Sequence, residues 1–192
     1  MNANKKRINT PGEEKDLNEY LQTLKLQSFY DNYSKVAEMA AKNQWSYPQY
    51  LLQLAESELL LRNQRSIERR IKAARFPVVK TLDGFDWTWP KKINRLQVQD
   101  LFRLAFVEQK SNIIFLGGVG LGKTHLCSAL AYQACLKGYT VLYASAIDIV
   151  NTLSAAANCG DLKRELKKYV KPDILFMDEL GYLPVDKKGA DL

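Results

Sequence analysis

The chain has 192 residues, of which 46% are hydrophobic and 26% are charged, and this composition excludes a disordered or collagen-like protein. No apolar run approaches the roughly 18 residues that a membrane helix needs, and the polar N-terminus has no signal-peptide core. The three cysteines form no CxxC pair, which argues against a disulfide framework or a zinc site. We therefore expect a cytoplasmic protein with no membrane partner.

The net charge of +7 is unevenly distributed along the chain. Residues 1–110 hold 19 basic and 13 acidic residues, a net charge of +6, whereas residues 111–192 hold 9 and 8, a net charge of +1. A basic first half indicates an anionic partner, for which nucleic acid is the leading candidate. A solvated basic surface would give the same composition.

The first 75 residues favour a small helical module. Residues 1–16 are interpreted as a flexible, charged arm. Apolar residues then recur at helical spacing from Leu17 to Ala40, with a break in phase near residues 25–27, so one or two helices fit. Ser46 and Gln49 form a capping box that starts a further helix, and this helix should end near Arg75 because Phe76 precedes a proline. We expect residues 17–75 to be an N-terminal helical DNA-binding module.

The long helix of this module is predicted to have two different faces. The apolar face, expected to pack against the first helices, consists of Leu60, Ile67, Ile71 and Ala74. The opposite face carries a row of cations suited to a phosphate backbone: Arg62, Arg65, Arg69 and Lys72. Pairs at i, i+4 spacing, such as Glu58 with Arg62, leave a solvated face as the alternative.

Residues 76–110 are interpreted as a linker followed by a lead-in helix over residues 94–109. Asp83-Gly84 predicts a turn. The aromatic residues after it, Phe85, Trp87 and Trp89, could stack on a base, but covering the edge of a core is the favoured interpretation.

A phosphate-binding motif dominates the second half. Residues 112–116 predict a buried parallel strand, and the next eight residues satisfy the P-loop pattern G-x-x-x-x-G-K-[ST]. A helix should follow and end at Lys137-Gly138. The expected nucleotide-binding residues are Gly117, Gly118, Val119, Gly120, Leu121, Gly122, Lys123 and Thr124. Lys123 should reach the β- and γ-phosphates of ATP, and the Thr124 hydroxyl should bind Mg²⁺.

A second acidic site should lie at the end of another strand. The segment 172–179 is an apolar run that ends in two acids, typical of a Walker B strand. Asp178 is the candidate Mg²⁺ residue, acting through the water shell of the ion, and Glu179 is the candidate catalytic general base. His125, Cys127 and Cys135 are most simply packing residues.

Between these two sites we expect a strand over residues 140–144 and a helix from Ser145 to about Leu153. A stretch of small residues then leads to a second short helix over residues 161–169. That helix carries four cations, Lys163, Arg164, Lys167 and Lys168, which could contact nucleic acid or form a solvated face.

With these motifs in place, the chain resembles IstB-type ATPases, the helper proteins of insertion-sequence transposases, and more distantly DnaC-type helicase loaders. The resemblance rests on "NIIFLGGVGLGKTHL", "ILFMDELGYLP" and "LLLRNQRSIERRIKAARFP". It implies an α/β P-loop NTPase of the AAA+ group with a three-layer core. It also implies ATP and Mg²⁺ as cofactors, self-assembly into ATP-dependent oligomers on double-stranded DNA, and recruitment of a cognate transposase.

The sequence departs from that group after residue 179. AAA+ proteins continue with a sensor strand, an arginine finger and a helical lid, whereas only 13 residues follow Glu179 here. We therefore expect residues 111–192 to form an AAA+ core that is incomplete at its C-terminus. Three functions stay open: an ATPase that helps transposition, a remnant that binds nucleotide or DNA without hydrolysis, and a helicase loader.

Overall fold

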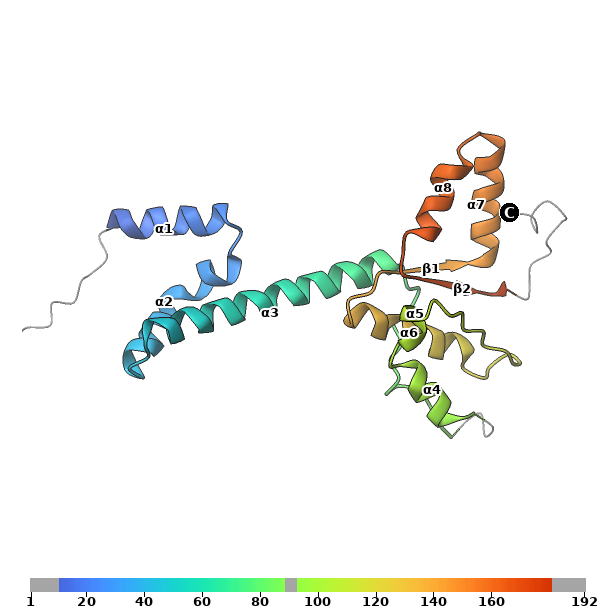
Figure 1. Cartoon of the computed structure of the whole chain (residues 1–192), viewed down its shortest axis with the longest axis horizontal. Coiled ribbons are helices and arrows are strands. Elements are labelled where there is room, and N and C mark those ends of the chain that lie inside the picture. Colours follow the sequence, from blue (N-terminus) through green and yellow to red (C-terminus); the bar gives the residue numbers. More distant parts are fainter. Residues whose placement is uncertain (1–10, 89–92, 181–192) are drawn as a thin grey trace, which may run out of the picture. The chain divides into compact units, whose positions relative to one another are not determined.

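A computed structural model of the chain describes residues 11–88 and 93–180 (Figure 1). The chain divides into two compact units, Met1–Ser66 and Ile67–Leu192. The division falls within one long helix, nine residues before the expected boundary at residue 75. Each unit has buried side chains of its own.

The first unit is built from helices. Helix α1 spans Pro11–Thr23, α2 spans Gln27–Lys42, and α3 begins at Tyr47 and continues to Ala74. The phase break near residues 25–27 is therefore confirmed as the connection between two helices, and Lys25 there adopts a φ of 55°. Among the described residues of this unit, Leu21, Val36 and Leu54 are the buried hydrophobic side chains, one from each helix.

The expected flexible arm is wrong for residues 11–16, which belong to α1. Proline is favoured in the first turn of a helix, where its missing N–H is not needed, and acidic residues in that turn complement the helix dipole. Pro11, Glu13 and Glu14 provide these features. Residues 1–10 lie outside the described part of the chain.

The capping box at the start of α3 is confirmed. The Ser46 N–H donates to Gln49 Oε1 at 2.8 Å, and the Gln49 N–H donates to Ser46 Oγ at 3.4 Å. These reciprocal bonds satisfy backbone groups that a helix N-terminus would otherwise leave unpaired.

The apolar face expected on α3 is only partly correct. Leu60 is 71% exposed, so it does not pack against α1 and α2. Ile71 and Ala74 are packed, but within the core of the second unit. The helical periodicity correctly places these residues on one face, but it cannot show that the two ends of α3 belong to different cores.

In the described part of the second unit, a two-stranded parallel sheet lies between helices (Figure 1). Strand β1, Val141–Ser145, pairs in parallel with β2, Ile174–Asp178, and Tyr143 is the register partner of Phe176. Helix α6, Lys123–Leu136, lies against one side of the sheet. Helices α7, Ala146–Asn158, and α8, Leu162–Val170, form the crossover on the other side. This arrangement gives the α/β layering expected of a P-loop fold.

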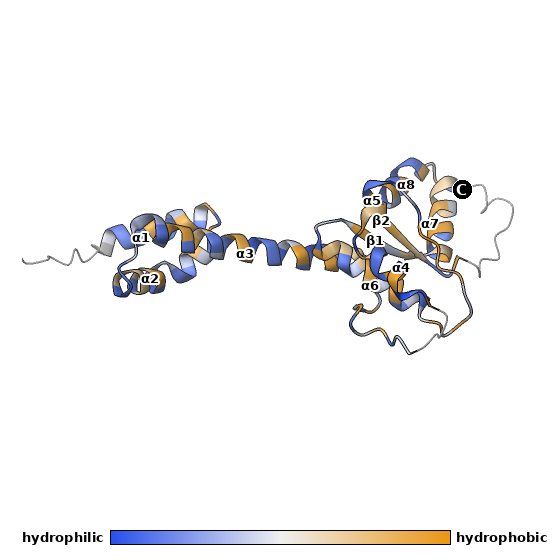
Figure 2. Ribbon diagram, turned by 60° about the horizontal axis from the view of Figure 1, so that its bottom comes forward, coloured by the Kyte–Doolittle hydropathy of each residue, from blue (hydrophilic) through white to orange (hydrophobic). Residues whose placement is uncertain are grey.

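Buried residues of α6 and the two strands form most of the main core, together with one residue of α3 and the residue before helix α5, Ala105–Glu108. Its members are Ala74, Leu104, Leu130, Ala131, Ala134, Cys135, Val141 and Phe176. Figure 2 shows hydrophobic residues concentrated on the strands and α7, whereas α8 is largely hydrophilic. Cys135 is fully buried, and Cys127 packs at the edge of this core, which confirms both as packing residues.

The strand expected at residues 112–116 is not formed in the described part of the chain. Ile113 and Phe115 pack against the cores, but Ile114 and Leu116 are 73% and 88% exposed. A strand needs a hydrogen-bonded neighbour, and within the described residues β1 and β2 pair only with each other. The segment therefore has the alternating burial of a strand without its ladder.

Two helix boundaries also differ from expectation. The lead-in helix at 94–109 is two helices, α4 (Arg95–Leu101) and α5 (Ala105–Glu108), because Leu104 takes a φ of 66° while burying its side chain in the core. Helix α7 extends to Asn158 rather than Leu153. The small residues expected to leave the helix include alanines, which have the highest helix propensity.

Candidate nucleotide-binding site

The P-loop backbone turns at two glycines before α6 begins. Gly120 and Gly122 have φ values of 79° and 78°, in the left-handed region that side chains disfavour. Gly122 is also the N-cap of α6, so the loop leads directly to a helix N-terminus with unpaired N–H groups. This is the arrangement in which backbone donors bind phosphate oxygens.

Gly122 meets a second restriction, from the connector. A Cβ atom at this position would lie 2.6 Å from Cε2 of Phe85, whose side chain is 7% exposed. The close approach of a buried ring therefore requires glycine here in addition to the backbone angle.

Lys123 and Thr124 begin α6 and point to different partners. The Lys123 ammonium donates to the Gly118 carbonyl at 2.7 Å, across the P-loop. The Thr124 hydroxyl donates to Oδ1 of Asp178 at 3.4 Å. The fold thus brings together two expected Mg²⁺ residues that are 54 positions apart in sequence.

Among the described residues, three groups donate hydrogen bonds to the Asp178 carboxylate. Oδ1 accepts from Thr124 and, at 2.9 Å, from the Glu179 N–H. Oδ2 accepts from the Tyr143 hydroxyl at 3.3 Å. Carboxylate and hydroxyl oxygens are the ligands that Mg²⁺ prefers, so Thr124 and Asp178 suit this ion.

Tyr143 is a site residue that the sequence pattern did not single out. Burial raises the pKa of Tyr143 to about 12, and the negative charge of Asp178 contributes to the increase. The phenol therefore keeps its proton at neutral pH and acts as the donor. The sequence places it in a strand, but the strand register that brings it near Asp178 cannot be read from the sequence.

Glu179, the expected general base, follows β2 directly. Its side chain is exposed and its φ is 61°. A positive φ in a residue other than glycine is uncommon and occurs preferentially at functional sites. Its backbone N–H donates to the carboxylate of the preceding residue at 2.9 Å.

The connector packs on the start of α6. Phe85 lies edge-on to Trp87 and to His125, with ring centroids 5.0 and 5.3 Å apart. The Nε2 of His125 lies 2.9 Å from the Thr81 carbonyl oxygen. These contacts confirm a packing function for His125, and they favour core covering over base stacking for Phe85 and Trp87. Trp89 lies outside the described residues.

Cys127 lies one turn into α6, near the same carboxylate. Burial, and then the charge of Asp178, raise the pKa of its thiol to about 12. The thiol is therefore uncharged at neutral pH, which fits a packing side chain.

The basic residues of α3 differ in their surroundings. Arg62 forms an ion pair with Glu58 at 2.7 Å and donates to the Lys25 carbonyl at 3.2 Å. Burial alone would raise the pKa of Glu58, but hydrogen bonds from Arg62 and the Ser28 N–H outweigh it and hold the pKa below its usual value. Arg62 therefore helps to join α3 to the α1–α2 connection. The cations at 65, 69 and 72 are exposed on α3.

The cations of α8 are partly neutralised by neighbours. Arg164 pairs with Asp161 and Lys168 with Glu165, both at 2.7 Å. Lys163 and Lys167 are exposed on the same helix. Two of the four α8 cations therefore form ion pairs within the helix region, and the other two are exposed.

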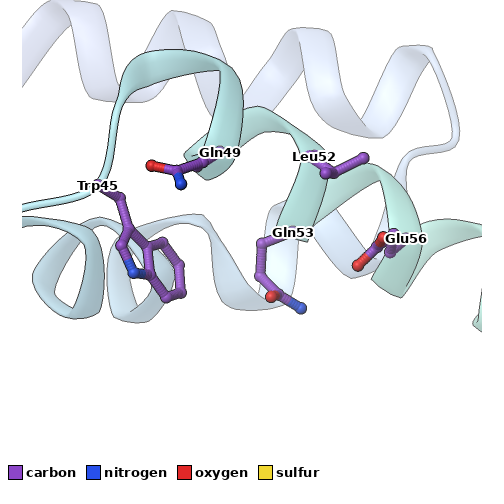
Figure 3. Close-up of a pocket in the computed structure, with 5 residues that line it drawn as sticks. All are labelled: Trp45, Gln49, Leu52, Gln53 and Glu56. Atoms are coloured by element: carbon purple, nitrogen blue, oxygen red, sulfur yellow. The ribbon is translucent and has the colours of Figure 1, made fainter. Parts of the chain in front are cut away.

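An open hollow in the first unit contains none of the expected site residues. It is lined by Trp45, Gln49, Leu52, Gln53 and Glu56 (Figure 3). The nucleotide site is defined instead by the backbone of the P-loop and by the groups around Asp178.

A glycine-rich loop capping a helix, with a parallel strand that ends in Asp178 beside it, defines a P-loop NTPase domain. The family described as IstB-like ATP binding protein matches residues 19–192. The chain belongs to this family.

Individual relatives agree with that assignment. The chain is 37% identical over 174 residues to a protein of insertion sequence IS5376 from Geobacillus stearothermophilus, with 91% of the chain and 69% of the relative covered. It is 38% identical over 177 residues to a protein of insertion sequence IS21 from Pseudomonas aeruginosa, with 92% and 67% covered. It is 34% identical to a protein of insertion sequence IS232 from Bacillus thuringiensis, with 90% and 69% covered. All three relatives are described as ATP-binding.

Within residues 11–88 and 93–180, no helix combines the length and the hydropathy required to cross a bilayer.

Proposed function

We propose that the chain binds ATP with Mg²⁺ at its P-loop and acts as a DNA-dependent helper in insertion-sequence transposition. The observation that carries the nucleotide part is the contact between Thr124 and Asp178 beside a P-loop whose turns require Gly120 and Gly122. The names of the relatives support the insertion-sequence setting.

Each site residue has a distinct task in this proposal. The P-loop N–H groups and Lys123 bind the phosphates, and Lys123 must exchange its contact with the Gly118 carbonyl for a phosphate oxygen. Thr124 and Asp178 would hold Mg²⁺, which neutralises phosphate charge when bound. Glu179 would orient or deprotonate the attacking water.

The DNA part of the proposal rests on charge. Exposed cations at residues 65, 69 and 72 follow one ridge of α3, at steps of four and three, and the α8 cations are a second candidate surface. Such a row of exposed cations is suited to contact a phosphate backbone. We infer that DNA-bound chains self-assemble with ATP and recruit a cognate transposase in the cytoplasm.

ATP-dependent assembly on double-stranded DNA tests this function. The wild-type chain should form oligomers on DNA only with ATP and Mg²⁺, and Lys123→Ala should abolish them because the phosphates lose their cation. Lys137→Ala, at the other end of α6, is the matched control and should assemble normally. Assembly that is unchanged in Lys123→Ala would refute the proposal.

Hydrolysis and partner choice separate the alternatives. Mg²⁺-dependent ATP hydrolysis that is lost in Glu179→Gln would exclude a remnant that only binds. Recovery of a replicative helicase rather than a transposase in a pull-down would favour a helicase loader.

A further inference from the structure

Tyr143 is placed beside Asp178 by the pairing of β1 with β2. Its register partner is Phe176, two residues before Asp178. Side chains alternate between the two faces of a sheet, so Tyr143, Phe176 and Asp178 lie on one face. The main core includes Phe176, with Tyr143 packed against it, and four of its eight buried residues belong to α6, so this face is the one covered by that helix.

Packing against Phe176 orients the ring of Tyr143 independently of the hydrogen bond from its hydroxyl to Asp178. The ring packs edge-on against Phe176, with centroids 4.8 Å apart and ring planes at 74°. A ring held by such packing loses little further freedom when its hydroxyl forms a hydrogen bond. The 3.3 Å contact with Asp178 Oδ2 therefore starts from a side chain that is already oriented.

The two oxygens of Asp178 have separate donors. Thr124 and the Glu179 N–H both donate to Oδ1, whereas Tyr143 donates to Oδ2 in the described part of the chain. A threonine hydroxyl can bind a cation through an oxygen lone pair and still donate its proton to Asp178. Thr124 and the Glu179 N–H can therefore both hold Oδ1, whereas Tyr143 is the described donor that holds Oδ2 and so fixes the rotation of the carboxylate.

We propose that Tyr143 is a positioning residue that holds the Asp178 carboxylate in the orientation required for Mg²⁺-nucleotide binding. This inference rests on the proposed function, because that function makes Asp178 a Mg²⁺ residue. Groups that orient metal-binding side chains typically contribute 10–100-fold to metal affinity or activity. The hydrogen bond is long, so we expect an effect at the lower end of that range.

Tyr143→Phe isolates the hydroxyl, because it keeps the ring that packs on Phe176. Tyr139→Phe is the matched control, since Tyr139 also packs against the main core and the substitution removes the same atom. Affinity for a fluorescent ATP analogue is measured on the full chain, first in EDTA and then as Mg²⁺ is added. Thermal unfolding of each variant is recorded alongside.

Tyr143→Phe should raise by about tenfold the Mg²⁺ concentration at which half of the Mg²⁺-dependent gain in affinity for the ATP analogue is reached. Its affinity for the analogue in EDTA should be unchanged, and Tyr139→Phe should behave as wild type in both conditions. A Mg²⁺ dependence equal to that of wild type would overturn the inference. Equal losses with and without Mg²⁺ would also overturn it, because they indicate a packing function only. If the wild-type chain itself shows no Mg²⁺-dependent binding, the proposed function fails and this inference fails with it.

Discussion

At the scale of single residues, the contact between Gly122 and Phe85 joins the connector to the nucleotide loop. Glycine is required at position 122 for two separate reasons, its φ of 78° and the Phe85 ring, which would lie 2.6 Å from a Cβ atom there. The P-loop pattern accounts for the first reason only. The second comes from an aromatic residue 37 positions earlier, which the sequence places at the edge of a core without identifying its neighbour.

Gly122→Ala should therefore destabilise the second unit by about 1–3 kcal/mol, from the left-handed backbone and from steric overlap. Urea unfolding measures this change. Gly118→Ala is the control for stability, because a Cβ there would make only ordinary contact, at 3.9 Å from Leu121.

Introducing Gly122→Ala into a Phe85→Leu background separates the cost of the left-handed backbone from the cost of steric overlap with the ring. Removing the ring should reduce the cost of Gly122→Ala, since neighbouring substitutions couple energetically. An identical cost in both backgrounds would show that the ring does not restrict this position.

At the scale of elements, the parallel strands are joined by a reciprocal clamp between Thr140 and Asp173, the residues just before β1 and β2. The Thr140 N–H and hydroxyl both donate to Oδ2 of Asp173 at 2.7 Å, and the Ile174 N–H donates to the Thr140 carbonyl at 3.1 Å. These bonds fix the register that places Tyr143 opposite Phe176. The clamp lies at one end of the sheet and Asp178 at the other.

The clamp should make stability depend on pH. Hydrogen bonds from the Thr140 backbone and hydroxyl lower the pKa of Asp173 below its ordinary value of 3.8. A lowered pKa in the folded state means that this stabilisation is present above about pH 4 and is lost as the pH falls through the folded-state value. The carboxylate is exposed, so the contribution is about 1 kcal/mol or less.

Asp173→Asn should accordingly reduce stability at neutral pH, and the difference from wild type should disappear in acid. Urea unfolding at a series of pH values measures it. A difference that persists undiminished at about pH 3, below the ordinary aspartate pKa, would contradict this interpretation of the clamp.

The helices and strands differ in how well their positions can be predicted from the sequence. Local signals place α3, α6, β1, β2 and α8 to within about two residues, because caps, glycines and apolar periodicity act over short distances. The segment 112–116 is misassigned because its residues have strand propensity, whereas strand formation depends on a neighbour elsewhere in the chain. The candidate site is predictable for the P-loop and Asp178, but not for Tyr143, whose position depends on register.

At the scale of the whole molecule, the long helix α3 contributes to two cores. Leu54 is buried in the first unit and Ala74 in the second. The exposed cations at 65, 69 and 72 lie between these two buried positions in sequence. Arg62, in contrast, is held by Glu58 and the Lys25 carbonyl, so replacing it would disturb folding as well as charge.

The DNA proposal is therefore best tested without Arg62. Replacing Arg69 and Lys72 by Gln should flatten the dependence of log K on log salt by about two units, because two phosphate contacts are lost. Lys35 and Lys42, exposed on α2, provide the control pair with the same charge change. A slope that is equally affected by both pairs would show that the ridge on α3 is only a solvated face.

The central claim is that residues 117–124 bind the phosphates of a nucleotide, and titration calorimetry of ATP against AMP on the full chain tests it most directly. We expect ATP to bind at least about tenfold more tightly than AMP, a difference of about 1.4 kcal/mol or more, and Lys123→Ala to remove most of this difference. Equal affinities for ATP and AMP, or an ATP preference that survives in Lys123→Ala, would contradict it.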